Sequence, residues 1–84
     1  LTLTLASELA PKIRVDGIAS GPIPTEVGQD FMKLSEDELR ESYKKIIPLG
    51  RIGEGEDIAA AAIYLASPAA SWITGITIPV AGGL

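Results

Sequence analysis

The sequence predicts an α/β fold in which a parallel β-sheet is only partly contained in this chain. Two short segments, residues 13–19 and 76–80, are rich in the β-branched side chains that favour strands. Helical patterns separate them, and strands joined through helices pair in parallel with a right-handed crossover. Because parallel sheets are normally buried on both faces, two such strands predict further partners, in the same polypeptide or in another one.

The first segment, residues 1–10, is predicted to be helical. Leu1, Leu5 and Leu9 recur every four residues, which is the spacing of one helix face. The alternation of Leu and Thr over the first five residues also fits a strand, but the Ala-Ser-Glu-Leu-Ala that follows favours a helix. Pro11 ends this helix, because the residue before a proline avoids helical angles.

A second helix is predicted to begin at Ser35. Ser35 and Glu38 have the spacing of a capping box, in which each side chain bonds the backbone N–H of the other residue. The apolar face of this helix is predicted to consist of Leu39, Tyr43 and either Ile46 or Ile47.

A third helix is predicted to begin near residues 54–57 and to end at Ala66. It is apolar nearly all round, so it should be covered on more than one side. The three carboxylates of its first turn raise the alternative of a metal or ion site. We favour stabilisation of the helix terminus, because acidic groups complement a helix N-terminus, Arg51 lies beside them and the chain has no His. No metal is therefore predicted.

The composition argues against several classes of protein. The chain has 84 residues, a formal net charge of −4, and neither Cys nor His. An acidic chain lacks the basic surface of a nucleic-acid-binding protein, and no apolar run is long enough to suggest a membrane span. The absence of Cys fits a reducing compartment, so a cytoplasmic location is expected. The chain starts without Met inside a periodic segment, which predicts a fragment or a processed piece.

Four segments, in order and at sensible spacing, resemble the short-chain dehydrogenase/reductase family. They are residues 5–15, residues 21–25, residues 48–59, and residues 64–75 together with 80–83. The second of them is similar to the family's Pro-Gly-x-Ile-x-Thr loop. The chain departs from the family pattern at four positions, with Asp16 for the usual Asn, Ser20 for Pro, Gly55 for Pro and Ala81 for Asp. These departures affect details of the loop and not the resemblance.

The resemblance implies the C-terminal part of a Rossmann-like, doubly wound parallel sheet. It also implies an oxidoreductase that uses NAD or NADP and acts on a small carbonyl or alcohol substrate. Without the resemblance, the loop at residues 21–25 would be an ordinary connection. With it, the residues that hold the nicotinamide end of the cofactor are Gly21, Pro22, Ile23 and Thr25.

Residues 26–47 correspond to the family's substrate-binding lid. Its apolar candidates for substrate contact are Phe31, Met32 and Leu34, and packing in the core explains the same residues about equally well. No catalytic residue is predicted here: the family's Ser and its Tyr-x-x-x-Lys pair lie upstream of the matched segments, and the residue four places after Tyr43 is Ile47. The alternative is a non-catalytic interaction or oligomerisation fragment.

The sequence also predicts a homo-oligomer, either a dimer or a tetramer. The third helix is apolar on more sides than one sheet covers, and Pro79 marks the last strand as a sheet edge because it has no N–H to donate. Trp72 lies between these two elements and is a suitable anchor for a contact with a second copy. Burial by another part of the same chain is the alternative.

Overall fold

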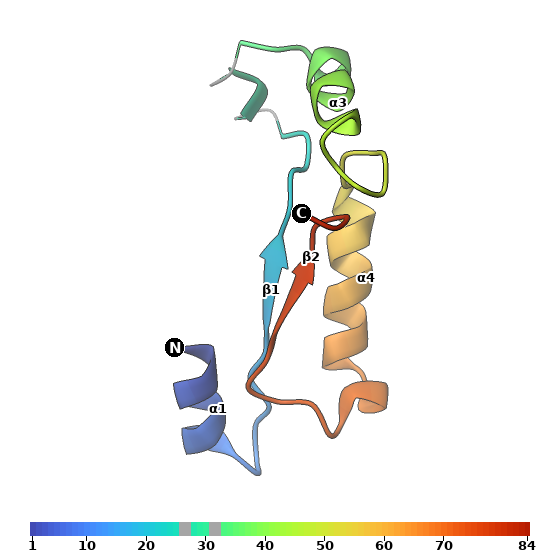
Figure 1. The fold of residues 1–84 in the computed structure, drawn as a ribbon. Coiled ribbons are helices and arrows are strands. Elements are labelled where there is room, and N and C mark those ends of the chain that lie inside the picture. Colours follow the sequence, from blue (N-terminus) through green and yellow to red (C-terminus); the bar gives the residue numbers. More distant parts are fainter. Residues whose placement is uncertain (26–27, 31–32) are drawn as a thin grey trace.

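The computed structural model describes residues 1–25, 28–30 and 33–84, and it has the predicted order of helices and strands (Figure 1). Residues 28–30 are helical, and the other elements, in chain order, are α1 (Thr2–Leu9), β1 (Gly17–Ser20), α3 (Glu36–Lys44), α4 (Gly55–Ala66), a single 3₁₀ turn (Pro68–Ala70) and β2 (Thr77–Val80). The two strands are parallel, as predicted. The α/β fold class is therefore confirmed.

Hydrogen bonds fix the orientation of both strands. The N–H of Gly17 donates to the carbonyl of Ile76, and the N–H of Gly21 donates to that of Val80. Since backbone groups alternate between the two edges of a strand, the ring nitrogen of Pro79 points away from β1. By the same alternation, β1 turns the backbone groups of Ile18 away from β2, and within the described residues the sheet has no third strand to meet them.

The predicted first strand began too early. Regular pairing starts at Gly17. Before that point the carbonyl of Val15 still accepts the N–H of Gly75, but side-chain oxygens replace the neighbouring backbone acceptors. The N–H of Val15 donates to Oγ1 of Thr74, and Oδ1 of Asp16 accepts from the N–H of Ile76. Ile13, predicted to lie in the strand, instead donates its N–H to the carbonyl of Leu9 and is more than half exposed.

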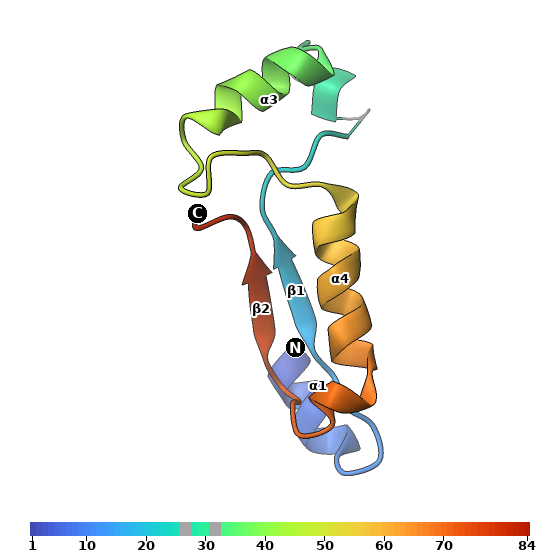
Figure 2. The same cartoon turned by 90° about the vertical axis from the view of Figure 1, so that its right-hand side faces the viewer.

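The helices lie on opposite sides of the strand pair. Figures 1 and 2 show α4 running along one side of both strands and α1 beside their starting ends on the other. The approach of α1 is close, since a Cβ on Gly75 would stand 3.1 Å from Cδ1 of Leu3 and 3.4 Å from Cβ of Ala6. A sheet with helices on both sides is the layering of a doubly wound fold.

A small core joins α3 to the start of α4. Leu39, Ile47 and Ile52 are buried against one another, and Leu34 and Tyr43 pack on them. The predicted apolar face of this helix is thus confirmed, with Ile47 and not Ile46 as its last member. The N–H of Glu38 donates to Oγ of Ser35, which also confirms the predicted capping box.

The chain buries less surface than a compact domain of its size. It exposes 6032 Å², whereas a folded monomer of 8.7 kDa exposes about 4,700 Å². Its radius of gyration is 15.6 Å, against about 12 Å for a compact domain of this length. The folded chain therefore leaves apolar surface that other protein surfaces can cover.

Part of that apolar surface lies on α4 and on the turn after it, and another part lies at the start of α1, where Leu1 and Leu3 are exposed. The side chain of Ile63 is 71% exposed, and that of Trp72 is 99% exposed. Leu65 is the buried residue of α4, on the side that faces the strands. The second cover that the sequence predicts for this helix is thus not supplied by the described residues, and it stays a prediction. Within those residues, no helix combines the length and the apolar character that crossing a bilayer requires.

Candidate functional site

The loop at residues 21–25 leaves the carboxyl end of β1, where parallel α/β sheets bind their ligands. Gly21 begins this loop, and its N–H donates to the carbonyl of Val80 at 2.9 Å. A Cβ on Gly21 would stand 2.6 Å from Cα of Ala81, closer than real atoms approach. Only glycine fits, because the first residue of the loop lies directly against the end of β2.

Pro22, the next residue of the loop, is bonded to the segment that precedes α4. The carbonyl of Pro22 accepts the N–H of Gly53 at 3.0 Å. A Cβ on Gly53 would lie 3.3 Å from that carbonyl oxygen and 3.4 Å from Cγ1 of Ile23. The predicted cofactor loop is therefore in close contact with the segment that precedes α4.

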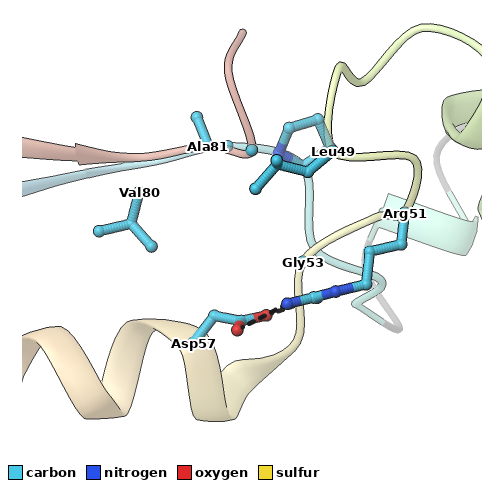
Figure 3. A pocket seen from close by; sticks show the side chains of 9 residues that line it. Leu49, Arg51, Gly53, Asp57, Val80 and Ala81 are labelled. Atoms are coloured by element: carbon cyan, nitrogen blue, oxygen red, sulfur yellow. Dashed lines mark hydrogen bonds and ion pairs between the residues drawn. The ribbon is translucent and has the colours of Figure 1, made fainter.

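A small pocket of about 110 Å³ lies between the strand ends and the start of α4. Figure 3 shows Val80 and Ala81 on one side of it and Asp57, joined to Arg51, on the other. The pocket is lined by Gly21, Pro22, Leu49, Arg51, Gly53, Asp57, Val80, Ala81 and Gly82. Two of the four predicted cofactor residues, Gly21 and Pro22, thus share this pocket, and Ile23 and Thr25 lie outside its lining.

Arg51 and Asp57 form a two-bonded ion pair at the side of the pocket. Nη1 of Arg51 lies 2.8 Å from Oδ2 of Asp57, and Nη2 lies 3.0 Å from Oδ1. Oδ2 also accepts the N–H of Glu54 at 2.8 Å. The bonds from Arg51 and then from the Glu54 amide lower the pKa of Asp57 from 3.8 to about 2. Asp57 therefore stays ionised and fixes the turn before α4.

Arg40 of α3 makes the second charged connection to this turn. Its guanidinium bonds both carboxylate oxygens of Glu54 and also Oε1 of Glu36 at 2.9 Å. These bonds raise the pKa of Arg40 and lower that of Glu54. Two of the carboxylates at the start of α4 are thus neutralised by arginines. In the described part of the chain, no group of three potential ligands is arranged to hold a metal ion.

The hydrogen-bonding capacity of the loop is concentrated at two residues. Within residues 1–25, 28–30 and 33–84, the N–H of Ile23 donates to no other group. Oγ1 of Thr25 accepts the N–H of Gly28 at 3.0 Å. A threonine hydroxyl that accepts one bond still has its hydrogen to donate. Ile23 and Thr25 can therefore offer two donors to a ligand amide or carbonyl.

The predicted substrate residues have different outcomes. Leu34 packs against the cluster of Leu39, Ile47 and Ile52, which supports the core alternative for that side chain without testing substrate contact. Phe31 and Met32 lie outside the described residues. Substrate contact by these three residues stays a prediction.

Several residues of the site were missed by sequence reasoning. Gly53 was missed because it reaches Pro22 through a non-local contact. The pairing of Arg51 with a carboxylate of the first turn of α4 was expected, and Asp57 is its partner. Gly82 was also missed: it has a φ of 65°, and its carbonyl accepts the N–H of Leu49 at 3.0 Å.

A parallel strand pair between helices, with a tight loop at its carboxyl end, places the chain among α/β proteins that bind ligands at strand ends. The chain belongs to the short-chain dehydrogenase/reductase family. A family model described as Enoyl-(Acyl carrier protein) reductase matches residues 1–84. The chain is also 45% identical, over 85 residues, to 3beta-hydroxysteroid dehydrogenase 1 of Eggerthella lenta, covering 100% of this chain and 32% of that protein.

Solved structures show the same likeness. A short-chain dehydrogenase/reductase from Brucella melitensis, described as a glucose/ribitol dehydrogenase, superposes with a TM-score of 0.85 at 40% identity, over 98% of this chain and 32% of that one. A 3-ketoacyl-(acyl-carrier-protein) reductase of the same organism, in complex with NADH, has a TM-score of 0.80 at 38% identity, over 98% and 31%. The fold is thus the Rossmann-like fold of this family, and the chain spans about a third of the length of these relatives.

Proposed function

We propose that the whole protein transfers a hydride between a nicotinamide cofactor, NAD or NADP, and a small carbonyl or alcohol substrate. Membership of the short-chain dehydrogenase/reductase family supports this activity, and one similar structure holds NADH. Because the chain spans about a third of its relatives, the activity is assigned to the whole protein, and the catalytic Ser, Tyr and Lys are expected in its remaining part.

The part of the site supplied by this chain is the loop that holds the nicotinamide. The observation that carries this proposal is the position of residues 21–25 at the carboxyl end of β1, with Gly21 and Pro22 both fixed by backbone hydrogen bonds. Two prolines stiffen the loop and remove two backbone donors. Donors remain at Ile23 and Thr25, where a carboxamide can bind. The bound cofactor supplies or accepts the hydride, and the loop orients its ring.

Residues 26–47 form the substrate-binding lid in this proposal. Its later part is well anchored, because Leu39 is buried and Arg40 bonds Glu54. Substrate contact is assigned to the segment before α3, which contains Phe31, Met32 and Leu34. The substrate class stays at small carbonyls and alcohols, since the relatives that support it act on different compounds.

The exposed apolar side of α4, together with β2 and Trp72, forms the contact between copies in a homo-oligomer. Supporting this are the 99% exposure of Trp72 and the outward-facing ring of Pro79, which leaves β2 as an edge. A two-fold contact would bury the same surface on both copies.

The test is a titration of the whole protein with NADH and with NADPH, followed by nicotinamide fluorescence. Saturable binding of one of them, and turnover of that cofactor with a panel of small aldehydes, ketones and alcohols, is expected. If neither nucleotide binds, the proposal is wrong, and a non-catalytic interaction fragment becomes the better assignment.

A further inference from the structure

We propose that Gly53 is a positioning residue for the cofactor loop. Its N–H and its lack of a side chain set where Pro22 and Ile23 lie, and thereby where the nicotinamide ring lies. The inference rests on the proposed function, but it concerns a residue outside residues 21–25 and more than 25 positions further along the chain.

The contact between Gly53 and the loop is both a bond and a steric limit. The Gly53 N–H donates to the Pro22 carbonyl at 3.0 Å. A Cβ on Gly53 would lie 3.3 Å from that oxygen and 3.4 Å from Cγ1 of Ile23, so a methyl group would displace its neighbours by a few tenths of an ångström. Gly53 is not among the residues with positive φ, so the need for glycine here comes from space and not from backbone angles.

The residues on both sides of Gly53 are held firmly in place. Ile52, the residue before it, is only 2% exposed and belongs to the core with Leu39 and Ile47. The residue after it, Glu54, donates its N–H to Asp57, which Arg51 holds with two bonds. Because residues on both sides of Gly53 are fixed, an added side chain would displace the loop and not these residues.

The loop in turn has little freedom to absorb such a displacement. Pro22 has a φ restricted by its ring, and Gly21 before it is fixed against Ala81. The first free donor after Pro22 is the N–H of Ile23. A shift of the Pro22 carbonyl therefore moves the donor proposed to bind the nicotinamide carboxamide.

The experiment separates the two ends of the cofactor. The whole wild-type protein and its Gly53→Ala variant are each titrated by calorimetry with two ligands. The first is NADH or NADPH, whichever the protein prefers. The second is ADP-ribose, or ADP-ribose 2′-phosphate if the protein prefers NADPH. ADP-ribose lacks the nicotinamide ring. Gly55→Ala is the matched control, since a Cβ on Gly55 meets nothing within 4 Å.

We expect Gly53→Ala to weaken dinucleotide binding about threefold to tenfold, because displacing the Ile23 N–H weakens one hydrogen bond to the carboxamide, and the loss of one such bond costs about that much affinity. Binding of ADP-ribose should stay unchanged, and Gly55→Ala should match the wild type for both ligands. Unchanged dinucleotide binding by Gly53→Ala would overturn the inference. Equal weakening of both ligands would overturn it too, because that outcome indicates general damage to the fold.

A second variant keeps the test decisive if Gly53→Ala does not fold. Arg51→Gln removes the two-bonded ion pair with Asp57 without adding atoms near Pro22. We expect this variant to lose less affinity for the dinucleotide than Gly53→Ala does, and to keep its affinity for ADP-ribose. If its affinity for each ligand equals that of the wild type, the inference is overturned. Failure of the wild type to bind either ligand would instead overturn the proposed function, and the inference with it.

Discussion

Gly21 and Ala81 are in direct backbone contact at the carboxyl ends of the two strands. A methyl group at Gly21 would stand 2.6 Å from Cα of Ala81 and 2.7 Å from its Cβ. Gly21→Ala should therefore force the strand ends apart and destabilise the whole protein by about 1–3 kcal/mol, the usual cost of overpacking. The measurement is a urea titration followed by circular dichroism.

The control for that substitution is Gly55→Ala, which adds the same methyl group in open space at the first residue of α4. Its unfolding midpoint should equal or exceed that of the wild type, since alanine favours helix over glycine. Equal midpoints for Gly21→Ala and the wild type would contradict the close contact.

Thr25→Ala should weaken cofactor binding by about 0.5–1.5 kcal/mol, the value of one hydrogen bond. Thr25→Ser keeps the hydroxyl and should bind like the wild type. Because Oγ1 of Thr25 also accepts the N–H of Gly28, the unfolding midpoint of each variant is measured beside its dissociation constant. Unchanged affinity in Thr25→Ala would remove this residue from the cofactor site.

Asp57 should make stability depend on acid pH. Its pKa is lowered from 3.8 to about 2 in the folded chain. A carboxylate whose pKa is lower in the folded than in the unfolded state stabilises the fold above the unfolded value, and this stabilisation is lost as the pH falls through the folded value. The wild type should therefore exceed Asp57→Asn in urea midpoint at neutral pH, and the difference should shrink between pH 3.8 and about 2.

Salt provides an independent check of the same pair. Arg51 and Asp57 are partly exposed, so added sodium chloride should reduce the difference at neutral pH by screening. A difference that changes with neither pH nor salt would mean that the ion pair does not stabilise the fold.

Ala62→Glu should dissociate a homo-oligomer of the whole protein. Ala62 is exposed on α4 next to Ile63, and a carboxylate buried in a contact between copies is costly. Sedimentation velocity at low concentration measures the change. Ser42→Glu, which adds the same charge on the exposed surface of α3, should leave the oligomer intact. A monomeric wild type would refute the predicted assembly.

Residues 1–84 expressed alone should show no sharp thermal unfolding transition. The described residues contain six buried apolar side chains, and the chain exposes 6032 Å². Such a small core does not offset the conformational entropy lost on folding. Circular dichroism of dilute peptide during heating measures this, and a steep, reversible transition in a monomer would show that the prediction is wrong.

Local signals accounted for most of the secondary structure. The capping box at Ser35 and Glu38 and the acidic start of α4 predicted both helices, because helix ends depend on residues three or four positions apart. The early start assigned to β1 failed for a non-local reason. Oγ1 of Thr74 and Oδ1 of Asp16 replace two backbone acceptors before the pair begins, and each of these bonds joins residues about sixty positions apart.

The candidate site was only half accessible to sequence reasoning. Gly21 and the two prolines predicted a loop, and the cofactor role of that loop came from the resemblance to the family. The contact between Gly53 and Pro22 joins segments about thirty residues apart, and it depends on how α4 is placed against the strands. Pairings of that kind follow from the packed structure and have no periodicity in the sequence.

The backbone groups of Ile18 that face away from β2 have a consequence for handling the protein. An open strand edge accepts any extended segment that comes near it, including the same edge of another molecule. Recombinant production of residues 1–84 alone should therefore give insoluble, cross-β material rich in intermolecular pairing. Co-production with the rest of the whole protein, which we expect to supply a neighbouring strand, should keep it in the supernatant.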